Sequence, residues 1–287
     1  MRIGVGLPNP VPGTPGDGLV EWARRAEERG FTGLATIDRI AYPTHDSLVV
    51  LAAAAGATSR IGLMTNILLA PLYSPPILAK AAASLDQISR GRLTLGLAPG
   101  GRADDFTVTG RDFDTRGADF DEALEVMHRA WRGDPIPGSK RRVTPKPVRD
   151  RKVPIMIGGS GERAIARSVQ WGDGWTASGM SPDAAGAIAQ QVRDAWRQSE
   201  RTAEPRLAAL TYYSLGADVD DDSRWYLRDY YGFLGEMADQ IADSALRSEA
   251  AVRGAVRSYQ GAGFTELYFV PTVGAVHQVD RLADLVL

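Results

Sequence analysis

The chain has 287 residues, of which 44% are hydrophobic and 24% are charged, and its formal net charge at pH 7 is −2. These proportions are typical of a soluble globular protein, and the charge gives no electrostatic reason to expect a nucleic acid or an anionic membrane as a partner. The absence of cysteine excludes disulfides, thiolate catalysis and iron–sulfur clusters, and it fits a reducing, cytoplasmic compartment.

Short apolar runs alternate with amphipathic stretches through the first half of the chain. Residues 2–8 predict a strand, and with one basic residue before two prolines they do not have the composition of a signal peptide. Further strands are expected over 33–38, 61–69 and 92–100, and helices over 16–30, 46–58, 75–89 and 115–133. The longest apolar run, 48–57, falls inside one of these helices and is far too short to cross a bilayer.

Residues 134–152 interrupt this alternation. The segment has four prolines, seven basic residues and little apolar content, which is typical of an excursion or lid loop. We expect its basic side chains to be solvated, with a clamp on a polyanion as the alternative. The second half then predicts strands over 153–158, 173–178, 206–213 and 264–271, and helices over 161–171, 182–200 and 275–287, with two helical segments inside 221–262.

Eight strands that alternate with helices predict an α/β fold, a (β/α)8 TIM barrel formed as a single domain over residues 1–287. A doubly wound open sheet is the alternative. It is less favoured because the glycine-rich turn GGSGER, residues 158–163, lies in the middle of the chain. No acidic residue follows the next strand, where such a sheet would hold a ribose.

The turn itself raises the question of a ligand. Gly158, Gly159, Ser160 and Gly161 stand between an apolar strand and a helix. Exposed amides at the start of a helix bind anions such as phosphate, so we expect an anion here. A tight turn without any ligand is an equally consistent interpretation at this point.

In a barrel of this kind, active sites form at the carboxyl ends of the strands. These ends and the loops after them carry Leu7, Asp38, Arg39, Thr65, Asn66, Ala98, Gly100, Trp175, Tyr212 and Tyr213. There is no lysine for a Schiff base, no paired carboxylates and no clustered spacing for a metal site. His45 follows the second strand and stays a candidate, whereas His128 and His277 lie in predicted helices. Small, aromatic and neutral polar residues suit a pocket that leaves the chemistry to a large planar cofactor.

Several segments, in order, resemble the bacterial luciferase-like family of flavin-dependent oxidoreductases and monooxygenases. They are AEERGFTGLATID (26–38), PPILAKAAASLDQISRGRLTLGLAPGG (75–101), VPIMIGG (153–159) and GDGW (172–175). The resemblance implies a barrel that binds FMN or coenzyme F420 at its carboxyl rim, with the cofactor phosphate on the amides of Gly159, Ser160 and Gly161. It also implies that the isoalloxazine ring rests against a bulge in the third strand near Asn66 and Ile67, often with a non-prolyl cis peptide.

The resemblance assigns roles to the rim residues. The expected cofactor-binding residues are Asp38, Thr65, Asn66, Ile67, Ala98, Gly100, Gly158, Gly159, Ser160, Gly161 and Trp175. The catalytic candidates are Arg39, His45 and Asn66, and the substrate-side candidates are Leu7, Arg39, Phe106, Tyr212 and Tyr213. Family members often have a histidine where this chain has Arg39. Because a guanidinium stays protonated, Arg39 cannot act as a base; it either binds an anion or pairs with Asp38 or another acid.

Three functions are compatible with these features. The favoured one is a monooxygenase that uses reduced FMN, delivered by a separate flavin reductase, and dioxygen on a small organic substrate, with F420-dependent hydride transfer as its alternative. The second is a cofactor-free barrel lyase or isomerase whose turn holds a phosphorylated substrate. The third is a non-catalytic flavin-binding protein. A homodimer is the assembly that the resemblance suggests, without a nucleic-acid or membrane partner and without a metal.

Overall fold

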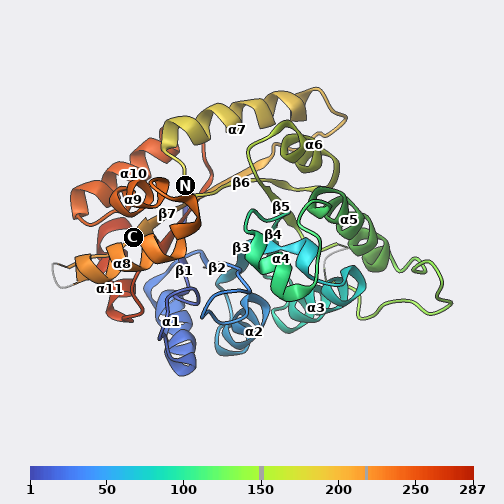
Figure 1. Cartoon of the computed structure of the whole chain (residues 1–287), viewed down its shortest axis with the longest axis horizontal. Helices are drawn as coiled ribbons and strands as arrows, with labels where there is room; N and C mark the ends of the chain where they lie inside the picture. Colours follow the sequence, from blue (N-terminus) through green and yellow to red (C-terminus); the bar gives the residue numbers. More distant parts are fainter. Residues whose placement is uncertain (149–151, 217–218) are drawn as a thin grey trace.

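In the computed structural model, which describes residues 1–148, 152–216 and 219–287, eight parallel strands close into a barrel in chain order (Figure 1). The strands are β1 (Arg2–Gly6), β2 (Gly33–Thr36), β3 (Gly62–Leu69), β4 (Leu93–Ala98), β5 (Ile155–Gly158), β6 (Gly174–Ala177), β7 (Arg206–Tyr213) and β8 (Glu266–Pro271). Pairing of β8 with β1, with Arg2 beside Glu266, closes the ring. The predicted TIM barrel is therefore confirmed, and the open sheet is wrong.

Helices follow the strands and surround the barrel (Figure 1). They are α1 (Gly16–Arg29), α2 (Ser47–Ala57), α3 (Pro75–Ile88), α5 (Arg116–Arg132), α6 (Glu162–Trp171), α7 (Pro182–Arg197), α10 (Glu249–Gly261) and α11 (His277–Val286). All except α10, for which no separate bounds were predicted, lie within three residues of their predicted bounds. In α1 the inward face is the apolar stripe of the sequence, with Leu19 and Trp22 buried, and Gly30 ends the helix at a φ of 93°. Among the described residues, no helix is long and apolar enough to cross a membrane.

Two segments contain more helix than the sequence predicts. The stretch between β4 and α5 forms a short helix, α4 (Ala103–Thr109), where only loose chain was expected. The segment after β7 forms α8 (Asp220–Tyr230), a 3-10 turn (Gly232–Leu234) and α9 (Met237–Ser244) before α10, instead of two helical segments. Both additions follow the carboxyl ends of strands, so they shape the mouth of the barrel.

The core has two layers because successive residues of a strand point to opposite sides. Met64, Met156, Leu210 and Tyr268 belong to the cluster inside the barrel. The larger cluster lies between the barrel and the helices and holds, among many others, Leu7, Trp175 and Tyr213. The layer to which a strand residue belongs decides whether it can reach a ligand at the mouth.

The excursion at 134–152 is present but is not a lid. Its described part forms no helix or strand, and residues 149–151 lie outside the described residues. It packs against α3, where Gln87 donates to the Lys146 carbonyl at 2.7 Å and the Val148 amide donates to Asp86 at 2.8 Å. Because this end of α3 leads into the start of β4, the contacts lie toward the amino ends of the strands, opposite the expected active site.

Candidate functional site

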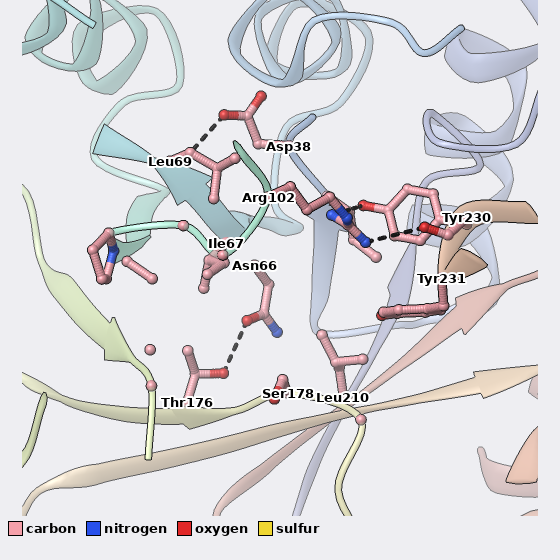
Figure 2. Close-up of a pocket in the computed structure, with 18 of the residues that line it drawn as sticks. Asp38, Asn66, Ile67, Leu69, Arg102, Thr176, Ser178, Leu210, Tyr230 and Tyr231 are labelled. Atoms are coloured by element: carbon pink, nitrogen blue, oxygen red, sulfur yellow. Dashed lines mark hydrogen bonds between the residues drawn. The ribbon is translucent and has the colours of Figure 1, made fainter. Parts of the chain in front are cut away.

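A cavity of about 390 Å³ opens at the carboxyl ends of the strands (Figure 2). Its volume lies within the roughly 300–1,000 Å³ typical of small-molecule sites. It is lined by residues from the ends of β2 to β7 and from the segment after β7. The residues that the sequence predicts at a ligand site and that do line it are Asp38, Asn66, Ile67, Ala98, Gly100, Gly158, Gly159 and Tyr212.

The third strand is irregular where the resemblance places a bulge. The Asn66–Ile67 peptide bond is cis, and the register between β3 and β4 shifts between Thr65 and Leu68. Ile67 thereby faces the cavity beside Gly158, where an added Cβ would lie 3.2 Å from the Ile67 side chain. The expected position of the bulge is confirmed, and the glycine at position 158 leaves room for the Ile67 side chain beside β5.

Asn66 presents a buried hydrogen-bond donor to the cavity. Its side-chain oxygen accepts a hydrogen bond from the Thr176 hydroxyl at 2.9 Å, while its Nδ2 is buried with no partner among the described residues. Figure 2 shows the nitrogen turned away from Thr176. A buried donor without a partner is costly, so a ligand with an acceptor at this point would satisfy it. Thr176 is not among the residues predicted at the site, although its place near the end of β6 was a usable signal.

The glycine turn after β5 is open to the mouth. Gly159 has a φ of 109°, and Ser160 and Gly161 are exposed just before α6. In the described structure, no hydrogen bond takes up the amide of Ser160 or Gly161. The free amides and the start of a ten-residue helix form a site suited to a phosphate. Gly158 and Gly159 line the cavity itself, whereas Ser160 and Gly161 lie beyond its lining.

Trp175 stabilises this turn from the layer between the barrel and the helices. Its indole faces the layer between barrel and helices, and its Nε1 donates to the Gly159 carbonyl at 2.7 Å. The prediction that Trp175 touches the cofactor is therefore corrected: Trp175 holds the turn. The alternation of side chains along β6 places Thr176, and not Trp175, on the cavity side.

Asp38 is a buried acid at the edge of the cavity, with 4% of its surface exposed. Its carboxylate accepts a hydrogen bond from the Leu69 amide at 3.0 Å and others from the Tyr73 hydroxyl at 3.2 Å. Burial raises the pKa of Asp38 from its ordinary 3.8 to about 6, although these hydrogen bonds oppose the shift. Asp38 fixes the end of β3, next to the bulge.

The catalytic candidates Arg39 and His45 do not line the cavity. Arg39 pairs with Asp104 at 2.7 Å, donates to the Tyr230 carbonyl at 3.2 Å and lies over the Tyr42 ring. The expected ion pair is thus present, but its acid is in α4 and is not Asp38. A ring nitrogen of His45 lies 2.8 Å from the Thr14 carbonyl. Both side chains join loops around the mouth.

Four further candidates lie away from the cavity lining. Thr65 donates to the Gly96 carbonyl at 2.8 Å inside the barrel wall. Leu7 and Tyr213 belong to the layer between barrel and helices, because their neighbours on the strands point inward. Phe106 packs with Leu69 and Leu72 beneath the mouth. None of these four side chains lines the cavity, and the predictions that place them at cofactor or substrate are corrected.

A side of the cavity that the sequence did not predict is formed by Arg102, Tyr230, Tyr231 and Phe233. The Arg102 guanidinium lies 4.3 Å from the centre of the Tyr230 ring and 4.6 Å from that of Phe233, and it donates to the hydroxyl and to the carbonyl of Tyr230, both at 3.3 Å. Burial raises the pKa of Tyr230 to about 12, so its phenol stays neutral. No local signal marks this side, because Arg102 and the aromatic residues are far apart in the chain.

Comparison with known proteins agrees with this geometry. The model of a family described as luciferase-like monooxygenase matches residues 1–274. A protein of Mycobacterium tuberculosis that is itself uncharacterised is 30% identical over 213 residues, which are 70% of this chain and 73% of the relative. Among solved structures, an F420-dependent secondary alcohol dehydrogenase with an F420–acetone adduct has a TM-score of 0.81 at 20% identity and covers 99% of this chain and 98% of its own. The monooxygenase RslO1 of Streptomyces bottropensis has a TM-score of 0.79 at 21% identity and covers 99% and 97%. At these identities the two structures support the fold.

Proposed function

The chain belongs to the luciferase-like monooxygenase family, whose members are oxidoreductases that use FMN or coenzyme F420 on small molecules, and we propose that it is a monooxygenase that uses reduced FMN and dioxygen. The observation that carries the proposal is the buried Asn66 Nδ2, which has no partner in the described structure, at the cis bulge and in one cavity with the glycine turn. A ligand with a flat ring and polar edge atoms would suit the bulge at Asn66, and its phosphate tail would suit the glycine turn.

The residues present fit FMN. The amides of Ser160 and Gly161 at the start of α6 would hold the phosphate, as free donors at a helix amino end do. Ile67 would offer an apolar surface to the ring, and the Asn66 Nδ2, which has no partner in the described structure, would be free to donate to an acceptor on the cofactor. When bound, reduced FMN supplies the electrons for the reduction of dioxygen.

The protein's own part is to position the substrate and to exclude water. Tyr230, Tyr231 and Phe233 shield one side of the cavity, and the neutral phenols of Tyr212 and Tyr231 lie 2.6 Å apart as a hydrogen-bonding pair. A site shielded in this way protects reactive species from hydrolysis. In this proposal a separate flavin reductase supplies the reduced FMN, as the family resemblance suggests.

F420-dependent hydride transfer is the second candidate. It is favoured by the fold likeness to the F420-dependent secondary alcohol dehydrogenase, and the glycine turn would serve the phosphate of either cofactor. The family histidine often found after the strand-two acid would be the expected partner for this chemistry. Arg39 occupies that position here and is turned toward Asp104, which favours the FMN proposal.

The test is an anaerobic titration of the apoprotein with FMN, reduced FMN and F420, followed by absorbance and fluorescence. Tight binding of reduced FMN, and substrate oxygenation when the complex meets dioxygen, would support the proposal. Preference for F420 would support hydride transfer. Binding of neither cofactor would leave the phosphorylated-substrate lyase or isomerase, and flavin binding without turnover over a broad substrate panel would leave a flavin-binding protein.

A further inference from the structure

Arg102 is a partly buried cation that no described carboxylate neutralises. Its Nη atoms donate to Tyr230, and its Nε is buried without a hydrogen-bond partner in the described structure. Aromatic rings surround the guanidinium, with ring centres at 4.3 Å for Tyr230, 5.4 Å for Tyr231 and 4.6 Å for Phe233. Rings attract a cation but do not neutralise it, so the charge remains available to a ligand.

Three other shielded arginines have a carboxylate partner, whereas Arg92, which has none, has its guanidinium hydrogen-bonded to backbone carbonyls and to the Thr58 hydroxyl. Arg39 has Asp104 at 2.7 Å, Arg167 has Asp121 at 2.6 Å and Arg206 has Glu266 at 2.8 Å. A buried charge is normally paired, because removal from water is costly without a partner. Asp38, the acid at the edge of the same cavity, is directed toward the Leu69 amide, as Figure 2 shows, and forms no ion pair with Arg102.

The position of Arg102 separates it from the phosphate end of the cavity. Gly158, which opens the glycine turn, is paired with Thr176 across β5 and β6. Figure 2 shows Thr176 on one side of Asn66 and Arg102 with Tyr230 and Tyr231 on the other. A cofactor whose phosphate lies at the turn therefore leaves Arg102 to a second molecule.

We propose that the substrate of this cavity is a planar organic carboxylate whose anionic group is bound by Arg102 and whose apolar body packs against Tyr231 and Phe233. The inference rests on the proposed function, since it takes FMN to occupy the end with the glycine turn. The guanidinium offers its free Nε–H and further Nη–H groups in one plane, which matches the two oxygens of a carboxylate. Because the aromatic rings already hold the Arg102 guanidinium in place, its side chain loses little conformational entropy when the anion binds.

The experiment compares matched acids and amides on the FMN-loaded protein. Benzoate, cinnamate and 2-naphthoate are titrated beside benzamide, cinnamamide and 2-naphthamide, and binding is read from the change in flavin absorbance. At least one acid should bind about tenfold or more tightly than its amide, as expected for a charge-assisted bidentate contact worth roughly 1.4 kcal/mol or more. If no acid binds more tightly than its amide, the proposal is wrong.

Two variants assign the effect to Arg102. Arg102→Met keeps an unbranched apolar side chain among the rings, and it should reduce the acid-to-amide ratio to about one, while Arg102→Lys should retain part of it. Arg39→Met removes the same charge and also one hydrogen bond to the Tyr230 carbonyl, but it lies outside the cavity lining and should leave the ratio unchanged. The ratio is insensitive to general loosening of the site, because loosening weakens acid and amide together.

The outcomes also separate this inference from the proposed function. FMN affinity is measured first; if FMN does not bind, the proposed function fails, and the acid–amide titration proceeds on the apoprotein by intrinsic fluorescence. If Arg102→Met lowers FMN affinity tenfold and leaves the acid-to-amide ratio as it was, the anion at Arg102 belongs to the cofactor and the inference is overturned.

Discussion

The Thr176 hydroxyl donates to the side-chain oxygen of Asn66 at 2.9 Å, and this single contact determines which end of the Asn66 amide faces the cavity. Thr176 and Asn66 are 1% and 2% exposed, so no solvent competes for the bond. With its oxygen held, the amide presents Nδ2 as a donor. The cavity is therefore prepared for a ligand that carries an acceptor beside the cis bulge.

Replacement of the Thr176 hydroxyl by a methyl group should weaken cofactor binding without changing the shape of the side chain. Thr176→Val keeps the volume but leaves the Asn66 oxygen buried and unpaired, which costs roughly 1–3 kcal/mol of stability. Because the amide is then free to turn over, we expect FMN affinity to fall about tenfold, or about 1.4 kcal/mol. Fluorescence titration with FMN and urea unfolding measure the two effects.

Thr65→Val is the matched control for that variant. The Thr65 hydroxyl is as deeply buried and donates to the Gly96 carbonyl at 2.8 Å, but its side chain does not line the cavity. A comparable loss of stability with FMN affinity within about twofold of wild type is expected. Equal losses of affinity in the two variants would mean that barrel destabilisation, and not the orientation of Asn66, governs binding.

The glycine turn gives a second prediction. Gly159→Val puts a β-branched residue at a φ of 109° and its Cβ 3.2 Å from the Ala164 side chain, so the turn must move. We expect FMN affinity to fall a hundredfold or more, which is about 2.7 kcal/mol. Gly161→Ala, where an added Cβ meets nothing within 4 Å, should retain FMN affinity. Unchanged affinity in Gly159→Val would contradict the phosphate assignment.

The sequence predicts the barrel well because short apolar runs of strand length alternate with amphipathic helical stretches along the whole chain. The bulge at Asn66 and Ile67 was foreseen only through the family resemblance, since nothing local in GLMTNILL marks an irregular strand. What the pattern does not show is which way a strand faces. Strands buried on both sides are apolar throughout, so their sequence does not tell which alternate residues face the barrel interior and which face the helices.

Because the facing of alternate strand residues cannot be predicted, most of the corrections at the site concern which neighbour on a strand points inward. Tyr212 and Tyr213 are neighbours on β7 and cannot both point inward; the structure places Tyr212 at the cavity and Tyr213 toward the helices. Trp175 and Thr176 on β6 divide in the same way. The aromatic side was missed for another reason. Arg102 follows β4 and Tyr230 lies in α8 after β7, and a contact between residues so far apart in the chain leaves no trace in the local sequence.

The buried acid Asp38 gives a prediction on pH. Because its pKa is raised to about 6 in the fold and is 3.8 in an ordinary environment, its favourable contribution is fully present below pH 3.8 and is lost as the pH rises through 6. Between pH 5 and 7 the wild type should lose about 1–1.5 kcal/mol of unfolding free energy relative to Asp38→Asn. Urea unfolding of both proteins at each pH measures the difference.

The difference between the two proteins is the proper readout, because His128 acts with opposite sign. Burial lowers its pKa to about 4, so His128 destabilises the fold as the pH falls below 6.5. That effect is common to both proteins and cancels in the comparison. Parallel profiles for wild type and Asp38→Asn would show that the Asp38 carboxyl does not change its charge in this range.

At the opposite end of the barrel, Glu266 should contribute to the stability of the fold and not to cofactor binding. Its buried carboxylate accepts hydrogen bonds from Arg206 at 2.8 and 3.0 Å and from Arg2 at 2.5 Å, where β7, β8 and β1 begin. Glu266→Gln leaves two guanidiniums without a counter-charge and should cost roughly 2–4 kcal/mol, because Arg206 is only 28% exposed. Arg2→Met, at a side chain 56% exposed, should cost less than about 1 kcal/mol.

FMN affinity should be unchanged in both variants, since Glu266 and Arg2 line no part of the cavity at the carboxyl ends. A loss of FMN affinity in Glu266→Gln at temperatures where the variant is fully folded would show that the two ends of the barrel are coupled, and would contradict the confinement of the site to its mouth.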